Sequence, residues 1–91
     1  MAIIVAGKLM LKPGARDEFI EKSHSAIVHA RELKTCANFS VSPDPIDKNR
    51  VNIFEKWSSR GELDAFRNID SDNGSFDLVE SFDIDEYEVN V

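Results

Sequence analysis

Hydrophobic and polar residues alternate in two different rhythms along the chain, and each rhythm predicts a different element. Residues 2–12 hold an apolar run followed by leucines that alternate with lysines, which predicts a strand that ends at Pro13-Gly14. Residues 15–34 repeat apolar and small side chains at steps of three and four, so these side chains share one stripe of a helix. The first third of the chain is therefore expected to be a strand followed by an amphipathic helix.

Two further strands are predicted in the middle of the chain. Residues 36–42 alternate between polar and apolar side chains, whereas residues 51–57 are rich in β-branched and aromatic residues. Pro43-Asp44-Pro45 ends the first of these strands, because a proline cannot donate a hydrogen bond to a neighbouring strand. The two strands are expected to pair across the polar segment that separates them.

A second helix is predicted to begin at Ser59. Ser59 and Glu62 have the spacing of a capping box, in which a hydroxyl and a carboxylate satisfy the free amides at a helix start. The apolar residues that follow fall on one helical face: Leu63, Phe66 and Ile69. Residues 70–75 are expected to form a loop.

The last strand is predicted at residues 79–91, where carboxylates alternate with apolar side chains. Phe82 and Ile84 occupy even positions but Tyr87 and Val89 occupy odd ones, so we expect a β-bulge near Asp85-Glu86. The acidic residues between them are expected to form the solvated face of an edge strand: Asp83, Asp85, Glu86 and Glu88.

This order of elements predicts one α+β domain over residues 1–91, with a ferredoxin-like βαββαβ order and a four-stranded antiparallel sheet. The third strand is apolar on both faces, with Ile53 and Trp57 on one face and Phe54, beside Asn52, on the other. Two helices cover only one side of such a sheet, so a second copy of the chain is expected to cover the other side in a homodimer. The alternative is a monomer whose sheet is partly exposed to water.

Composition narrows the list of partners and compartments. The formal net charge of −6 opposes binding to the phosphate backbone, so no nucleic acid partner is expected. The apolar amino terminus stops at Lys8, which predicts neither a signal peptide nor a membrane segment. The single cysteine, Cys36, has no partner for a disulfide, and two histidines without a second cysteine do not make the usual structural zinc site. A cytoplasmic protein without a bound metal is the expectation.

Several short segments together resemble the antibiotic biosynthesis monooxygenase family. They are Lys12-Pro13-Gly14 followed by Phe19, the stretch from Pro45 to Arg50, and Glu55-Lys56-Trp57 followed by Leu63. The resemblance covers nearly the whole chain and implies a homodimer that forms a two-sheet α+β barrel. It also implies an enzyme that needs no cofactor and oxidises quinol-like aromatic molecules with molecular oxygen.

The chain departs from this family at three informative positions. Phe66 stands where many relatives have a histidine, and Ile53 stands where quinol-oxidising members have an amide. Haem-degrading members have an asparagine where this chain has Gly7, and they have a late histidine, whereas no histidine follows His29 here. Haem is therefore not expected, and the reaction transfers less safely than the fold.

Three residues are the candidate catalytic residues: Trp57, Asn52 and His29. Trp57 would wall a substrate cavity, Asn52 would stabilise a substrate anion with its amide, and His29 would act as a base. Each has a structural alternative: a core anchor for the tryptophan, a backbone contact for the asparagine, and a boundary position without a catalytic task for the histidine. Glu55 shares the face of Trp57, and a buried carboxylate there needs a partner such as Arg50, Arg67 or His29, so a structural role is favoured for it.

Two functions remain open on this reasoning. The first is a cofactor-independent monooxygenase that acts on a small aromatic or enolisable molecule. The second is a non-catalytic dimeric domain that binds a small molecule or another protein, which the apolar residues Ile53 and Phe66 favour. A cavity next to the candidate residues would distinguish the two.

Overall fold

The computed structural model describes residues 1–68 and 74–90, and it contains four strands, two α-helices and one short 3-10 helix. The strands are β1 (Ala2–Leu11), β2 (Cys36–Pro43), β3 (Arg50–Trp57) and β4 (Val79–Val89). The helices are α1 (Arg16–Glu32), α2 (Arg60–Arg67) and η1 (Ser75–Leu78). Ile69, the first four residues of the predicted loop at 70–75, and Val91 lie outside the described residues.

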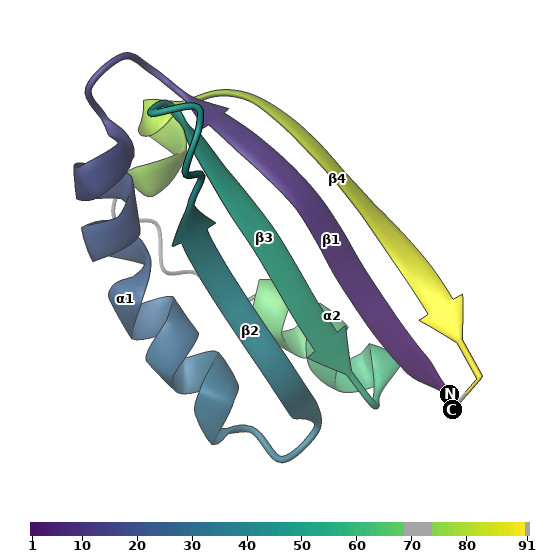
Figure 1. Cartoon of the computed structure of the whole chain (residues 1–91). Coiled ribbons are helices and arrows are strands. Elements are labelled where there is room, and N and C mark those ends of the chain that lie inside the picture. Colours follow the sequence, from purple (N-terminus) through teal and green to yellow (C-terminus); the bar gives the residue numbers. More distant parts are fainter. Residues whose placement is uncertain (69–73, 91) are drawn as a thin grey trace.

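The strands form one antiparallel sheet in the order β2-β3-β1-β4 (Figure 1). β1 lies in the centre, paired with β3 on one side and with β4 on the other. The βαββαβ order and the four-stranded antiparallel sheet confirm the predicted ferredoxin-like α+β fold. Within residues 1–68 and 74–90, no helix has the length and apolar character needed to cross a membrane.

The helix ends follow from local sequence. At the start of α2 the Glu62 amide donates to the Ser59 hydroxyl oxygen over 3.2 Å, as the capping-box spacing predicts. α1 begins after Ala15 without a side-chain cap, although Asp17 and Glu18 in its first turn suit the positive end of a helix. α1 starts and ends within two residues of the predicted range 15–34, and α2 starts one residue after the predicted start at Ser59.

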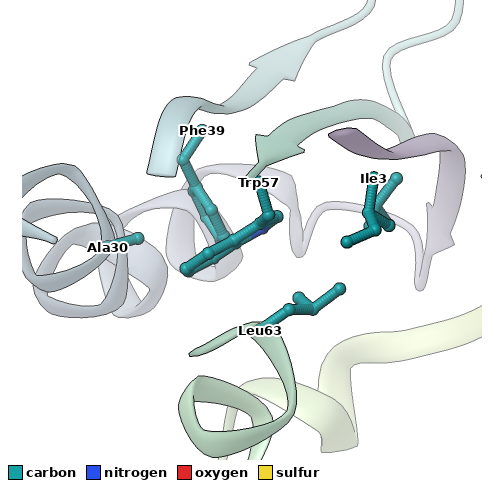
Figure 2. Packing of buried hydrophobic residues seen from close by; sticks show 6 residues of the cluster. Ile3, Ala30, Phe39, Trp57 and Leu63 are labelled. Atoms are coloured by element: carbon teal, nitrogen blue, oxygen red, sulfur yellow. The ribbon is translucent and has the colours of Figure 1, made fainter. Parts of the chain in front are cut away.

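The register of the strands places the odd-numbered residues of β1 and β3 on the face that the helices cover. Ile3 lies opposite Trp57, and both are fully buried. Leu63 from α2 and Ala30 from α1 point into the same space, and Phe39 from β2 completes the cluster (Figure 2). This cluster, called the core cluster below, joins both helices to three strands and fixes how they lie on the sheet.

The even-numbered residues of the same strands lie on the opposite face, called the open face below. Ala6 pairs with Phe54, and Ile4 pairs with Tyr87. Among the described residues no helix covers this face, and Phe54 is 41% exposed and Tyr87 51% exposed. The prediction that β3 is apolar on both faces is confirmed only for the covered face, where Ile53 and Trp57 are buried. On the uncovered side Phe54 lies among the polar side chains of β3: Arg50, Asn52 and Lys56.

The β-bulge predicted near Asp85-Glu86 is wrong. β4 pairs with β1 without interruption from Ser81 to Val89, and the register shifts instead next to Glu80, between the partners of Met10 and Leu11. The apolar residues of β4 move from even to odd positions after Ile84 because α2 places arginines over the covered face, where an acidic residue of β4 can bind them. Glu86 lies on that side and binds two arginines.

The carboxylates of β4 therefore do not share one solvated face, as was expected. The unbroken register puts Asp83 and Asp85 on the open face, opposite Lys8 and Ala6 of β1. Glu86 and Glu88 lie on the other face, where Arg60 of α2 forms ion pairs with both. Each face of β4 thus carries both acidic and apolar side chains.

Gly7 allows β1 and β4 to approach closely. A Cβ atom at this position would collide with the carbonyl oxygen of Asp83 and the Cα of Ile84 in β4. A larger residue therefore requires the backbone to move.

Candidate active site

A cavity of about 1010 Å³ lies on the covered face, between the sheet, α1, η1 and the end of α2. Its apolar walls come from all four strands and from the helices, among them Leu9, Phe39, Val41, Ile53, Phe66 and Ile84. Its polar groups include His29, Glu55, Arg67 and Glu86. A space of this size, mostly apolar with a few polar side chains, is typical of small-molecule sites.

Aromatic rings form one wall of this cavity. Phe66 of α2 stacks on the imidazole of His29 with 5.8 Å between ring centroids, and the planes are 20° apart. The same ring meets Phe39 edge-on at 5.5 Å and contacts the Trp57 ring at 5.4 Å. Phe66 thus connects the cavity wall to the core cluster, which holds these rings in place.

Glu55 of β3 lies beside this wall, because it pairs with Phe39 of β2. The indole Nε1 of Trp57 donates to Glu55 Oε1 over 3.0 Å. Partial burial raises the pKa of the Glu55 carboxyl above its ordinary value, and the nearby charge of Glu86 adds to this, while the Trp57 hydrogen bond and the charge of Arg67 oppose it. The result is a half-buried acid that is easier to protonate than one in water.

Glu86 lies in the same row of the sheet as Glu55, since both pair with Val5 of β1. Arg60 Nη1 donates to its Oε1 over 2.6 Å, and Arg67 Nη1 donates to its Oε2 over 3.0 Å. These two bonds lower the pKa of the Glu86 carboxyl, so it remains charged. The cluster ties the edge strand to α2 beside the cavity.

The three predicted catalytic residues are in different surroundings. His29 lines the cavity, whereas Trp57 is fully buried in the core cluster, where its indole contacts two residues of the cavity lining, Glu55 and Phe66. Asn52 lies on the opposite face of β3, so the structure does not bring it together with the other two. Its amide nitrogen donates to Asp44 Oδ1 over 3.0 Å, and its Oδ1 accepts from Arg50 Nε over 2.7 Å.

Asn52 belongs to a polar cluster that holds the connection between β2 and β3. Asp44 accepts from the backbone amides of Ile46 and Asp47 as well as from Asn52, and these bonds lower its pKa to about 2. Arg16 of α1 donates to the carbonyl oxygens of Asp44 and Asp47. This network orders a turn outside the cavity, which is a structural task.

Glu55, for which a structural role was favoured, lines the cavity together with His29. Arg50, Arg67 and His29 were the partners expected for it. Arg67 acts on it through its charge, but its hydrogen-bond donor is the indole of Trp57, two residues along the same strand. Residues at positions i and i+2 of a strand point to the same face, so the spacing Glu-Lys-Trp already indicated this pair. Phe66 was also treated only as a missing histidine, whereas its ring supports His29.

Among residues 1–68 and 74–90, no group of three or more histidine, cysteine or acidic side chains is arranged to hold a metal ion. Cys36 is half-buried, and burial raises the pKa of its thiol. A raised pKa disfavours the thiolate, which is the nucleophilic form. The polar side chains of the cavity include imidazole, carboxylate and guanidinium groups.

Comparison with known proteins identifies the class to which this fold and cavity belong. The profile of the antibiotic biosynthesis monooxygenase family matches residues 2–71, so the chain belongs to that family. An uncharacterized protein of Synechocystis sp. is 36% identical over 62 residues, which are 68% of this chain and 42% of that protein. The chain thus matches less than half the length of this relative.

Solved structures share the fold over almost the full length of the chain. A conserved protein from Methanosarcina mazei has a TM-score of 0.84 and 22% identity, and the match covers 99% of this chain and 94% of that one. A candidate antibiotic biosynthesis monooxygenase from Chloroflexus aurantiacus has a TM-score of 0.81 and 23% identity, with 100% of this chain and 96% of that one covered. Similarity at this level of identity establishes the fold.

Proposed function

We propose that the protein is a cofactor-independent monooxygenase that oxidises a small aromatic, quinol-like or enolisable molecule in the cavity of the covered face. One observation carries the proposal: the cavity combines a wall of aromatic rings with an imidazole and a half-buried carboxylate. Membership of the antibiotic biosynthesis monooxygenase family agrees with it. The rings suit a planar substrate, and the two polar groups suit removal of its proton.

The proposed reaction converts a phenol that has a free para position into a quinone. The phenol and O₂ give the quinone and one water molecule, so one oxygen atom enters the product and the substrate supplies all four electrons. Such a substrate must first become an electron-rich anion, which a base in a site with little water favours. His29 and Glu55 are the proton acceptors of the lining that the proposal uses, since Glu86 is engaged by two arginines.

The roles that we propose for the three candidate residues differ. His29 works at the cavity itself, and Trp57 holds the carboxylate of Glu55 from within the core. Asn52 keeps the turn after β2 in place through Asp44 and lies outside the reaction. We further propose a cytoplasmic location, because the lone half-buried thiol of Cys36 suits a reducing compartment.

We also propose that two copies pair through their open faces. The open face carries Ile4, Ala6, Phe54 and Tyr87 in adjacent positions, and no element of the same chain packs on them among the described residues. Burying these side chains against a second sheet removes apolar surface from water, which favours association. Sedimentation at micromolar concentration tests this, and a stable monomer of 10.3 kDa contradicts it.

Oxygen uptake tests the proposed reaction. A panel of 1-naphthols, anthrones and other phenols with a free para position is incubated with the protein in an oxygen electrode, and quinone formation is followed by absorbance. His29→Gln is expected to lower the rate, whereas the matched control His24→Gln, at a histidine that is exposed and outside the cavity lining, is expected to leave it unchanged. No oxygen uptake with any member of the panel contradicts the monooxygenase.

The second candidate function is a dimeric domain that binds a small molecule without transforming it. The observation that favours it is the apolar character of Ile53 and Phe66, which line the cavity where relatives with known activity carry polar groups. Saturable binding of the same phenols without any oxygen uptake identifies this function. The two candidates therefore differ in one measurement made on the same samples.

A further inference from the structure

Three apolar side chains line the cavity at the end where η1 meets β4: Phe76, Val79 and Phe82. The same three side chains, together with Glu80 and Ser81, line a second hollow of about 500 Å³, called the side groove below. The cavity and the side groove therefore share a wall, and the side groove continues the cavity toward the surface of the protein.

The two phenylalanines of the side groove are unusually exposed. Phe76 is 76% exposed and Phe82 is 74% exposed, compared with about half for the large apolar side chains of the open face. A single exposed apolar side chain is common on protein surfaces, but two aromatic rings that line one hollow are typical of a binding surface. The side groove is therefore suited to an apolar occupant.

A β-bulge in β4 brings the walls of the side groove to one face of the sheet. Val79 pairs with Leu11, which is buried on the covered face. Phe82 pairs with Leu9, which is buried on the same face. Residues three apart in a regular strand point to opposite faces, but the register shift between the partners of Met10 and Leu11 adds one residue to β4. Bulges of this kind re-aim side chains beside binding sites.

We propose that the side groove holds an unbranched apolar chain that belongs to the ligand of the cavity, so that the ligand is an alkyl-substituted aromatic molecule. Its ring lies in the cavity beside Phe39 and Phe66, and its chain lies against Phe76, Val79 and Phe82. This inference deepens the proposed function and rests on its placement of the ligand in the cavity. It does not require that the ligand is oxidised.

The volume of the cavity supports a ligand of two parts. Sites for drug-sized ligands measure roughly 300–1,000 Å³, and the cavity reaches the upper end of this range without the side groove. A single aromatic ring leaves much of this space to water. A chain that extends from the ring into the side groove removes apolar surface of both ligand and protein from water, which favours binding.

The proposed pairing of two copies does not use the side groove. That pairing involves the open face, where Phe54 lies, whereas Val79 and Phe82 lie on the covered face. Glu80 and Ser81 add polar groups to the side groove, and the core of a stable interface between proteins is depleted of charged residues. We therefore assign the side groove to the chain of a small ligand, and a second copy is the alternative that the test must exclude.

Calorimetric titration under argon tests the inference, because the absence of oxygen prevents turnover during binding. The probes are 3-alkylphenols with chains of two, four and six carbons, which leave the para position free. Phe76→Ser and Phe82→Ser remove the aromatic walls, whereas Phe82→Leu keeps an apolar side chain. The control is Ile46→Ser, at an exposed apolar residue that lines neither the cavity nor the side groove. The melting temperature of each variant shows that it is folded.

Affinity is expected to rise with the length of the chain. In the wild type each added methylene tightens binding about twofold, or about 16-fold from two to six carbons, which is about half the free-energy gain of full burial because the side groove is open to water. Phe76→Ser and Phe82→Ser each reduce the gain over the series to about threefold or less. Phe82→Leu keeps most of the gain, and Ile46→Ser keeps all of it.

Equal affinity of the wild type for the three probes overturns the inference. An undiminished gain in the folded variants Phe76→Ser and Phe82→Ser overturns it as well. A wild-type dimer that dissociates on Phe82→Ser substitution, without any effect of chain length, assigns the side groove to a second copy instead.

The same probes in the oxygen electrode separate this inference from the proposed function. An effect of chain length on binding without oxygen uptake removes the monooxygenase and leaves the side groove as a binding site. Oxygen uptake without any effect of chain length on binding removes the side groove and leaves the monooxygenase.

Discussion

The two faces of the sheet are made by the same four strands, yet they are packed to different degrees. On the covered face Ile3, Trp57 and Leu63 are completely buried, and a cavity lies beside them. On the open face Phe54 and Tyr87 keep about half of their surface exposed. A single chain supplies enough helix to bury one face, and large apolar side chains remain exposed on the other face.

The faces also differ in their polar groups. The covered face carries a half-buried carboxylate whose pKa is raised by burial, Glu55, next to aromatic rings. The turn at the end of the open face carries Asp44, whose pKa is lowered by hydrogen bonds to about 2. One acid is destabilised in its charged form and the other is stabilised, so the molecule separates a candidate reactive site from a structural one.

The largest effect is expected from breaking the covered face. Trp57→Ala removes the largest fully buried side chain, so we expect it to lower the free energy of unfolding by about 3–5 kcal/mol. Urea unfolding followed by circular dichroism measures this change, since the variant has no tryptophan. Trp57→Phe keeps most of the volume and serves as the control. A loss below about 1 kcal/mol would mean that the core cluster does not hold this face together.

The next effect concerns the open face and depends on the proposed dimer. Phe54→Asp places a charge among apolar side chains, so we expect the dimer to dissociate at least tenfold more readily, a change of about 1.4 kcal/mol or more. Analytical ultracentrifugation over a range of concentrations measures it. Ser42→Asp, on the outer strand of the same face, is the control. An unchanged dissociation constant would place the interface elsewhere.

A smaller effect is expected from acid at the turn after β2. The pKa of Asp44 is about 2 in the folded chain and 3.8 ordinarily, so between these values the unfolded chain holds more protons. Stability from this group is therefore present above pH 3.8 and is lost as the pH falls through about 2. Asp44→Asn should flatten the fall in urea midpoint over this window, whereas Asp17→Asn should not. Parallel curves for the wild type and Asp44→Asn would contradict the assignment.

The smallest effect is expected at Glu55, with the opposite sign. Its folded pKa is raised above 4.5, so the folded chain holds more protons in the window just above that value. Stability from this group is greatest below pH 4.5 and declines as the pH rises through the folded pKa. Glu55→Gln should remove this decline, measured as the melting temperature between pH 4 and pH 8. A steeper decline in the variant would show that the carboxylate is stabilised in its charged form.

Much of the fold could be predicted because it depends on short-range patterns. The period-two segments became β1, β2 and β3, the stripe of residues 15–34 became α1, and Ser59 caps α2 as its spacing indicated. The change of parity in β4 was noticed but given the wrong cause. A bulge and a change of partner produce the same pattern in sequence, and only the position of Arg60 and Arg67 over the strand distinguishes them.

The candidate site was less predictable, since it depends on which face each side chain meets. Asn52 and Trp57 both lie on β3, and their opposite parity was clear, but which parity faces the helices was not. His29 was placed on the flank of its helix, yet its contact with Phe66 joins two segments that are far apart in the chain. Contacts of this kind follow from packing and leave no local signal.

The sequence by itself determined the order of the elements, their approximate limits and the excess of apolar side chains on β3, because these follow from hydrophobic period and backbone preference. The tertiary structure alone decided that the odd-numbered residues of β3 face the helices, that Trp57 holds Glu55, and that a cavity is left beside them. The reason is that burial depends on what covers a residue, and the covering elements come from distant parts of the chain.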